Sequence, residues 1–393
     1  MDRNRTRRIV IYLLIAASVL LVAGRDANAD YVFGTPTNLG PTVNSSAEEW
    51  GVSLSADGLS LYFSSKRPGG QGNNDIWVST RATKEDDWAN PVNLGAPVNS
   101  SAEEGNPCIS PDGLELYFND HPAGPRPGNL GDGDIWVARR ANLSDAWGIP
   151  ENLGPTINTS SAEGWPSLSA DGLSLVFCSS WPDPGSATDW DLYVTSRATV
   201  DDLWSERVNL GPTVNSGSFD GGSALSADGL TLVLGSNRPG GSGVVDLWIT
   251  RRATTNDPWR EPVNLGPNVN SSAWQVTPNL TADGSTLYFV SNRAGGHGNF
   301  DIWQVSISPD VDLNNDGKVD LKDMGLLLMV GWGTDNSRYD IGPMPWGDGI
   351  VDGKDLMVLA EHGAILAGDA NYDGVVDFLD LAEVAKNWLR QQP

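Results

Sequence analysis

The chain has 393 residues, with 25 Lys and Arg against 50 Asp and Glu, a formal net charge of −25 at pH 7. A field of this sign repels nucleic acid and anionic lipid surfaces and favours cations. The composition therefore argues against a nucleic-acid-binding protein.

The first 29 residues have the pattern of a secretory signal peptide. Four arginines lie between Asp2 and Arg8, an apolar run of 15 residues extends from Ile9 to Ala23, and Ala27-Asn28-Ala29 forms an A-x-A cleavage site. The run is shorter than the roughly 20 apolar residues that span a bilayer. We expect cleavage near Ala29, no membrane span in the mature chain, and a secreted, periplasmic or cell-surface location. Removing five arginines and two aspartates leaves 20 basic against 48 acidic residues, a net charge of −28.

An octapeptide ending in Asn-Leu-Gly returns along the chain. It reads WANPVNLG at 88–95, WGIPENLG at 147–154, WSERVNLG at 204–211, WREPVNLG at 259–266 and, in weakened form, FGTPTNLG at 33–40. Successive Asn-Leu-Gly starts are 55, 59, 57 and 55 residues apart, so the sequence predicts five copies of one supersecondary unit.

Each copy has the alternation of short strands. In the first copy we expect strands over Trp50 to Leu54, Leu59 to Ser64, Asp75 to Thr80 and Trp88 to Asn93. The first two meet at an Asp-Gly pair, which suits a tight turn because glycine adopts positive φ freely. Four antiparallel strands per unit predict a propeller blade, and the whole pattern predicts an all-β, five-bladed propeller over residues 30–309.

The stretch SADGLSLYFSSKRPGG, followed by DIW at Asp75, resembles the WD-like propeller repeats of TolB-type proteins. The resemblance covers about residues 31–309. Repeats two and three lack the Ser-x-Arg tail of this pattern, with Asn119-Asp120-His121 and Ser179-Ser180-Trp181 in its place. The resemblance implies a propeller that binds partners and carries no shared catalytic set.

The fifth copy has no octapeptide of its own after Ile307, whereas an orphan octapeptide starts at Phe33. We expect the N-terminal strand to pair into the last blade and close the ring, which removes open sheet edges. Cys108 and Cys178 lie at non-equivalent places in different repeats. Buried thiols are the first interpretation, and a bridge in an oxidising compartment is the alternative.

One acidic position recurs where the loops enter the innermost strands. Its five occupants are Glu49, Glu104, Glu163, Asp220 and Gln275. A five-fold ring would gather them at the channel mouth, where close carboxylates raise one another's pKa unless a cation is shared. Three interpretations stay open: a solvated acidic rim, a cation or ligand site, and a glycoside hydrolase site using two of the carboxylates. The nearby Trp50, Trp165 and Trp274 could stack on sugar rings.

Residues 310–393 have a different pattern, with two segments of calcium-loop spacing. The predicted ligands are Asp312, Asn314, Asp316, the Lys318 carbonyl, Asp320 and Asp323 in the first loop, and Asp369, Asn371, Asp373, the Val375 carbonyl, Asp377 and Asp380 in the second. A degenerate loop between them keeps Asp348, Asp352 and Asp355. Amphipathic stretches follow each full loop, at Leu321 to Val330 and Leu381 to Leu389, and predict exit helices.

A calcium loop followed by an exit helix, with Asp at position 12, resembles a type I dockerin. The resemblance implies Ca²⁺ binding and a cohesin-type protein partner in a polysaccharide-related system. Positions 10 and 11, which carry recognition in that family, are Leu321-Lys322 and Phe378-Leu379 here, in place of small hydroxyl residues. The sequence thus predicts an exported binding or scaffold propeller with a calcium-ordered tail; the alternative is a secreted glycoside hydrolase.

Overall fold

The computed structural model describes residues 31–121, 125–180, 190–313 and 351–361, together with the single positions 319, 323, 326, 327, 333 and 341. The chain divides into two compact units, one over Phe33–Ile307 and the other formed by Met1–Val32 with Ser308–Pro393. The predicted signal peptide lies outside the described residues. Among the described residues, no helix has the length and apolarity to cross a membrane.

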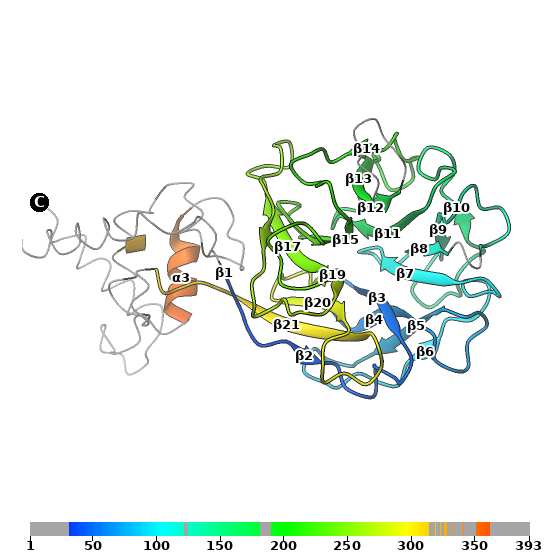
Figure 1. The fold of residues 1–393 in the computed structure, drawn as a ribbon, viewed down its shortest axis with the longest axis horizontal. Helices are drawn as coiled ribbons and strands as arrows, with labels where there is room; N and C mark the ends of the chain where they lie inside the picture. The colour runs from blue at the N-terminus through cyan, green and yellow to red at the C-terminus, as the bar shows by residue number, and fades with distance from the viewer. Residues whose placement is uncertain are drawn as a thin grey trace, which may run out of the picture. The chain divides into compact units, whose positions relative to one another are not determined.

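The larger unit is a propeller of five antiparallel sheets around a central axis (Figure 1). Blade 1 contains β3 (Glu49–Leu54), β4 (Ser60–Ser65), β5 (Asp75–Thr80) and β6 (Val92–Asn93). Blade 2 contains β7 (Glu104–Ile109), β8 (Glu115–Asp120), β9 (Ile135–Arg139) and β10 (Glu151–Asn152). Blade 3 contains β11 (Glu163–Leu168), β12 (Ser174–Ser179), β13 (Asp191–Ser196) and β14 (Val208–Asn209). Blade 4 contains β15 (Asp220–Leu225), β16 (Thr231–Ser236), β17 (Asp246–Arg251) and β18 (Val263–Asn264).

The fifth sheet combines the two ends of the repeat region. It contains β19 (Gln275–Leu280), β20 (Thr286–Ser291), β21 (Asp301–Pro309), β1 (Tyr31–Phe33) and β2 (Thr37–Asn38). Both N-terminal strands pair with β21, and in β2 the register places Asn38 opposite Trp303.

The predicted five-bladed, all-β architecture is confirmed, and the first three strands of a blade lie within one residue of their predicted bounds. The outer strand is shorter than predicted, with two residues in place of six. Pro91, Pro150 and Pro262 precede it in three blades and have no N–H for a ladder bond.

A buried asparagine compensates for the short outer strand. Asn99, 1% exposed, accepts a hydrogen bond from the Ile76 amide at 2.8 Å and donates to the Ile76 carbonyl at 2.9 Å. Its side chain also donates to Asn93 of the octapeptide at 2.9 Å. The same set of bonds recurs with Asn44, Asn158, Asn215 and Asn270. These side chains replace ladder bonds, because buried backbone groups need partners.

Neighbouring blades are joined by one backbone hydrogen bond that occurs five times. The amide of the first residue of each inner strand donates to a carbonyl one or two residues before the third strand of the preceding blade, as Glu104 does to Asn74 at 2.9 Å. The other four bonds are Glu49 to Phe300, Glu163 to Gly133, Asp220 to Trp190 and Gln275 to Val245. The junction between blades 5 and 1 thus has the same bond as the other four junctions.

The octapeptide tryptophan packs under an arginine on the outside of the blade. The Arg81 guanidinium lies 4.3 Å from the centre of the Trp88 ring, and Arg140 with Trp147, Arg197 with Trp204 and Arg252 with Trp259 repeat this at 4.3 to 4.4 Å. Such cation–π contacts stabilise an exposed or half-buried ring. Cys108 and Cys178 are both buried and free, which agrees with the first interpretation of the sequence.

The described part of the smaller unit has its own apolar cluster. It contains Val311, Leu313, Leu326, Leu327, Ile341, Val351, Leu356, Val358 and Leu359. The helix α3 (Gly353–Glu361) begins within the predicted degenerate loop and contains its last predicted ligand, Asp355. The predicted exit helices lie for the most part outside the described residues, so they stay predictions.

Blades 2 and 3 share an ion-pair cluster around Glu115. The carboxylate of Glu115 accepts from Arg139 at 2.8 Å, from the blade 3 residue Arg197 at 2.7 Å and from the hydroxyl of Tyr117 at 2.8 Å. Burial alone would raise the pKa of Glu115, but these bonds outweigh it and hold the pKa below its usual value.

We predict that Glu115→Gln lowers stability most at neutral pH. The ionised carboxylate contributes stability above its unfolded pKa of about 4.3, and this contribution is lost as the pH falls through the lowered folded value. The variant leaves the buried Arg197 uncompensated and costs about 3 kcal/mol at pH 7, with a much smaller difference at pH 3. Thermal unfolding of both proteins across this range measures the difference in stability. A difference that does not change with pH would contradict the role given to the Glu115 carboxylate.

Candidate functional site at the mouth of the central channel

The innermost strands of the five blades line the channel, and each contains a β-bulge. In all five blades the register with the second strand shifts just beyond the first two residues of the inner strand, as between Trp50 and Val52 in blade 1. The bulged residue has positive φ in every blade: Gly51 at 50°, Asn106 at 50°, Trp165 at 52°, Gly222 at 57° and Thr277 at 45°. Positive φ is costly for Trp and Thr, and bulges re-aim side chains near functional sites.

Two glycines leave room for their neighbours at this level. A Cβ atom on Gly51 would lie 2.4 Å from the Cα atom and 2.7 Å from the Oδ1 atom of Asn106. A Cβ atom on Gly222 would lie 3.1 Å from the amide nitrogen of Thr277. Small residues in blades 1 and 4 therefore allow Asn106 and Thr277 to sit at the channel.

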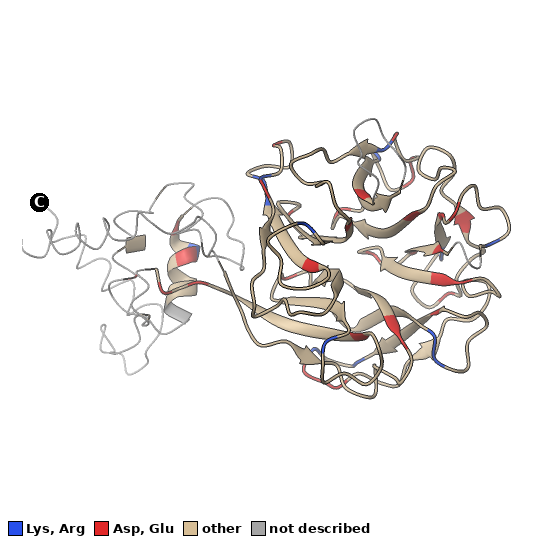
Figure 2. Ribbon diagram, viewed as in Figure 1, with Lys and Arg blue, Asp and Glu red and all other residues tan. Residues whose placement is uncertain are grey.

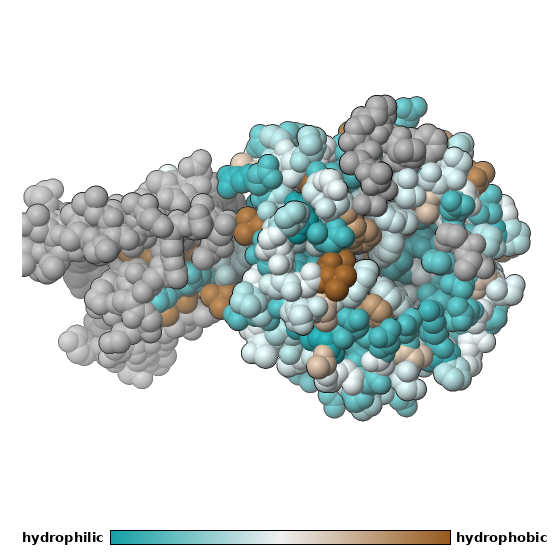
Figure 3. Space-filling view, viewed as in Figure 1, coloured by the Kyte–Doolittle hydropathy of each residue, from teal (hydrophilic) through white to brown (hydrophobic). Residues whose placement is uncertain are grey.

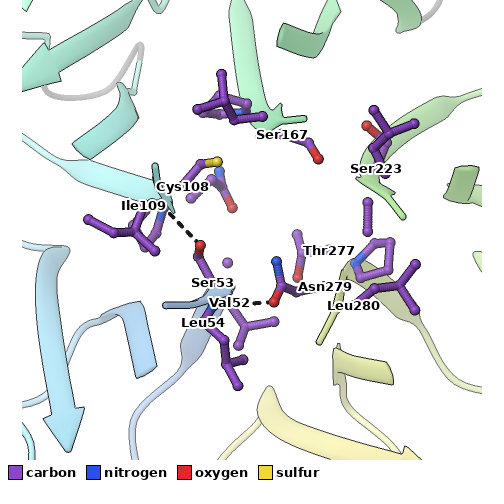
Figure 4. A pocket seen from close by; sticks show the side chains of 18 of the residues that line it. Val52, Ser53, Leu54, Cys108, Ile109, Ser167, Ser223, Thr277, Asn279 and Leu280 are labelled. Atoms are coloured by element: carbon purple, nitrogen blue, oxygen red, sulfur yellow. Dashed lines mark hydrogen bonds between the residues drawn. The ribbon is translucent and has the colours of Figure 1, made fainter. Parts of the chain in front are cut away.

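The bulges surround a cavity of about 120 Å³. Its lining alternates small, apolar and uncharged polar side chains, including Ser53, Cys108, Ser167, Ser223, Thr277 and Asn279 (Figure 4). Hydrogen bonds join neighbouring inner strands around the channel. The Ile109 amide donates to the Ser53 hydroxyl at 3.1 Å, and the Leu54 amide donates to the Asn279 side chain at 3.2 Å.

The five predicted mouth residues begin the inner strands but do not line this cavity. Glu49, Glu104, Glu163, Asp220 and Gln275 are all at most 1% exposed. Figure 2 shows the acidic residues spread over the blades, not gathered at one point. The solvated-rim interpretation of these positions is wrong, because their side chains are buried.

Each of these side chains bonds to its own loop and blade. In blade 1, Glu49 accepts from the amide of Ser45 at 3.0 Å, from its hydroxyl at 2.6 Å, from Ser65 at 2.9 Å and from Arg67 at 2.9 Å. Burial raises the pKa of Glu104 and of Glu163 against the effect of such bonds. Because the carboxylate oxygens already have protein partners, these contacts do not support the predicted ligand site.

All five blades have an arginine near the acidic position or its equivalent, although the place of this arginine in the sequence varies. Blades 1, 4 and 5 take it from the Ser-x-Arg tail, as Arg67, Arg238 and Arg293, and each donates to a carbonyl of the entering loop. Blade 2 takes it from Arg126, 2.7 Å from Glu104, and blade 3 from Arg207, 3.6 Å from Glu163. The two repeats without the Ser-x-Arg tail thus also have a guanidinium beside the acid, supplied by a different segment of the blade.

Blade 5 has the arginine without the acid. Gln275 stands at the acidic position and donates to Ser271 at 2.6 Å. The nearby Arg293 has no carboxylate partner among the described residues, and burial lowers its pKa to about 10.

Six aromatic residues, here named the mouth aromatics, surround the entrance: Trp50, Trp165, Trp190, Phe219, Trp274 and Phe300. Phe300 lies 4.0 Å from Trp50 and 6.4 Å from Trp274, measured between ring centres. In a second cluster, Trp165 lies 4.8 Å from Trp190 and 6.3 Å from Phe219. Trp274 is 36% exposed, and Trp165 also lines the cavity. The face of the propeller in Figure 3 is mainly polar, with apolar surface in small areas, one near its centre.

Sequence reasoning found three of the mouth aromatics and missed Trp190, Phe219 and Phe300. Trp190 and Phe300 directly precede the aspartate of the third strand, where the other repeats have Asn74, Gly133 and Val245. That departure from the repeat was the available signal. The hydroxyls of Ser223 and Thr277 have no hydrogen-bond partner among the described residues. The sequence carries no signal of this, because a serine or threonine in a strand looks the same whether or not it has a partner.

Most of the predicted calcium ligands lie outside the described residues. The described ones are Asp312, Asp323, Asp352 and Asp355. Asp323 is fully buried, whereas both carboxylate oxygens of Asp355 accept backbone amides, from Ile341 at 2.6 Å and Asp352 at 2.7 Å. Asp355 therefore acts in the first turn of α3 as a capping residue. The described residues contain no group of three His, Cys, Asp or Glu arranged to hold a metal ion.

We predict that Gln275→Glu stabilises the propeller. The new carboxylate would meet Arg293 as Glu49 meets Arg67, so a buried cation gains a counter-charge and the thermal midpoint rises by roughly 2 to 4 °C, about 1 kcal/mol. The matched control is Glu49→Gln, which removes the same pair from blade 1 and lowers the midpoint. Calorimetry of the three proteins tests the pair; a lower midpoint for Gln275→Glu would refute it.

The sequence matches no protein-family model and no curated protein. Solved structures with a similar fold include TolB from Acinetobacter baumannii, 14% identical over 73% of this chain and 66% of that one, with a TM-score of 0.41. A thermostable family-43 glycoside hydrolase is 12% identical over 70% and 92% of the two chains, with a TM-score of 0.47. An alpha-L-arabinofuranosidase from Lactobacillus brevis is 13% identical over 69% and 93%, with a TM-score of 0.48. At these identities the likeness is one of fold.

Proposed function

We propose that this chain is an exported, non-enzymatic propeller that binds neutral carbohydrate at its channel mouth and is tethered by a calcium-ordered tail. The observation that carries the proposal is the pair of aromatic clusters at the channel mouth, around Phe300 and Trp165. The cavity that Trp165 also lines presents hydroxyl and amide groups.

This combination suits a sugar chain. Aromatic rings provide large apolar surfaces, on which the apolar face of a sugar ring can rest, while hydroxyl and amide groups fix orientation. Trp274 offers the most exposed ring of the mouth aromatics. The negative charge of the whole chain disfavours an anionic polymer as the ligand.

The alternative of a glycoside hydrolase has less support. Such an enzyme needs two carboxyl groups that face the scissile bond, one of them able to give up a proton. Glu49, Glu104, Glu163 and Asp220 are buried and hydrogen-bonded within their blades. Their arrangement favours a structural role.

We predict that Trp274→Ala weakens binding of the recognised glycan by roughly 30-fold, about 2 kcal/mol, because it removes an exposed stacking surface. Affinity electrophoresis in gels that contain soluble neutral polysaccharides would find the glycan, and titration calorimetry would measure the affinity. The matched control is Leu203→Ala, which removes a 93% exposed apolar side chain outside the mouth and should leave binding unchanged.

Absence of binding to every neutral glycan by the wild type would refute the proposal. Release of sugar from a polysaccharide, abolished by Glu49→Gln or Glu104→Gln in a folded variant, would replace it with the hydrolase alternative.

We also infer that the N-terminal strand closes the ring. Support comes from the pairing of β2 with β21 and from Asn44. The Asn44 side chain bonds to the amide and the carbonyl of Ile302, as that of Asn99 does to those of Ile76. Deleting Tyr31 to Gly40 should therefore raise amide hydrogen exchange in β21 before that of other strands. Blade 3 is the internal control in the same measurement. Equal loss of protection in all blades would show that the strand contributes only to global stability.

The calcium-ordered tail is the third part of the proposal. Ca²⁺ would be held in the first loop by Asp312, Asn314, Asp316, the Lys318 carbonyl, Asp320 and Asp323, and in the second by Asp369, Asn371, Asp373, the Val375 carbonyl, Asp377 and Asp380. Oxygen donors of this number suit Ca²⁺, and the full burial of the carboxylate of Asp323 is compatible with a ligand role. The ion would neutralise carboxylates that otherwise repel one another. A cohesin-type or other protein partner of this tail remains part of the proposal.

We predict that chelation unfolds residues 310–393 and leaves the propeller folded. Metal binding supplies much of the folding free energy of such loops, and the separate unit of residues 33–307 has its own core. Calorimetry with and without a chelator should show one transition that depends on calcium and one that does not. The control is the double variant Asp323→Asn and Asp380→Asn, which should lack the calcium-dependent transition. A calcium-independent profile of the wild type would refute this part.

A further inference from the structure

Three polar atoms at the central cavity have no hydrogen-bond partner among the described residues. They are the Ser223 hydroxyl, the Thr277 hydroxyl and the Oδ1 atom of Asn106. Ser223 is 7% and Thr277 5% exposed, so bulk water reaches neither freely. Buried polar groups without partners destabilise a fold, and their persistence needs an explanation. The residues that carry them, in blades 2, 4 and 5, all line the same cavity.

The cavity excludes charged and large ligands. None of its lining residues carries a charge, so an ion would lose its hydration without gaining a counter-charge. The volume of about 120 Å³ is below the roughly 300 to 1,000 Å³ of pockets that enclose a whole small ligand. It admits one small end group of a molecule and not the body of a chain.

The unpartnered atoms specify a hydroxyl-bearing group. The amide nitrogen of Asn106 donates to Asn119 at 3.0 Å, so its free oxygen can only accept. The hydroxyls of Ser223 and Thr277 can both donate and accept. A group with several O–H bonds supplies donors to all three and accepts in return, and the Trp165 ring provides an apolar wall beside them.

We propose that the cavity binds one hydroxyl-rich terminal group of a neutral carbohydrate whose next residues lie on the mouth aromatics. The propeller would then recognise the end of a glycan chain. This inference rests on the proposed carbohydrate binding and adds which part of the glycan enters the channel. Trp165 joins the two sites, because it belongs to the mouth aromatics and to the cavity lining.

The test uses the full-length protein and neutral tetrasaccharides of β-1,4-linked glucose, xylose and mannose, measured by titration calorimetry. For the tetrasaccharide that binds best, O-methylation of one terminal residue should weaken binding at least tenfold, and O-methylation of the other should not. Thr277→Val and Ser223→Ala should each weaken binding of the unmodified sugar about tenfold, the loss of one hydrogen bond. The same variants without sugar should have an unchanged or higher thermal midpoint, because an unpartnered hydroxyl has been removed.

The matched control is Thr231→Val. Thr231 is also fully buried with an unpartnered hydroxyl, but it lies outside the cavity, so its variant should bind like the wild type.

Two outcomes would overturn the inference while leaving the proposed function intact. One is a protein that loses binding in Trp274→Ala but binds equally well as Thr277→Val and with either end methylated. The other is a lower thermal midpoint of Thr277→Val with unchanged affinity, which would assign the hydroxyls to structural water alone. If the wild type binds no neutral glycan, the proposed function fails and this inference fails with it.

Discussion

A buried asparagine side chain holds each blade together at the point where its β-ladder is shortest. The outer strands have two residues each, and their pairing alone would leave buried backbone groups without partners. Asn99 and its four equivalents accept from one amide and donate to the carbonyl of the same residue. Because one end of every third strand depends on this contact, the loops that carry the mouth residues are positioned by it.

Much of the fold could be predicted from the sequence because its turns leave few alternatives. The Asp-Gly pairs require positive φ, which Gly58 and its equivalents adopt, and this pins the register of the first hairpin. The alternation of apolar residues then defines the next strands to within a residue. The outer strand was predicted too long because its octapeptide recurs for reasons other than strand pairing. Its tryptophan packs under an arginine, and its asparagine accepts a hydrogen bond from the buried asparagine Asn99 or its equivalent.

The candidate site was less predictable. Alignment of the repeats shows which residues occupy equivalent positions, but it does not show whether their side chains are buried. Glu49 and its equivalents could be aligned, but the serine and arginine that bond to them lie 16 and 18 residues away across a hairpin. The bulged residues were also not apparent, because positive φ occurs there at Asn106, Trp165 and Thr277 as well as at glycine. Hydroxyls that lack a partner can be found only once the surrounding packing is known.

Arg207 illustrates how the propeller tolerates change among its repeats. It comes from the outer side of blade 3, yet its guanidinium lies over the Tyr193 ring at 5.5 Å, close to the 5.3 Å between Arg67 and Trp77 in blade 1. The positive charge is thus required at a place in the blade and not at a place in the sequence. Because Arg207 supplies that charge in blade 3, the Ser-x-Arg tail of blades 1, 4 and 5 is not needed for it there. A propeller built in this way can acquire a new binding loop in a single blade without losing its internal charge balance.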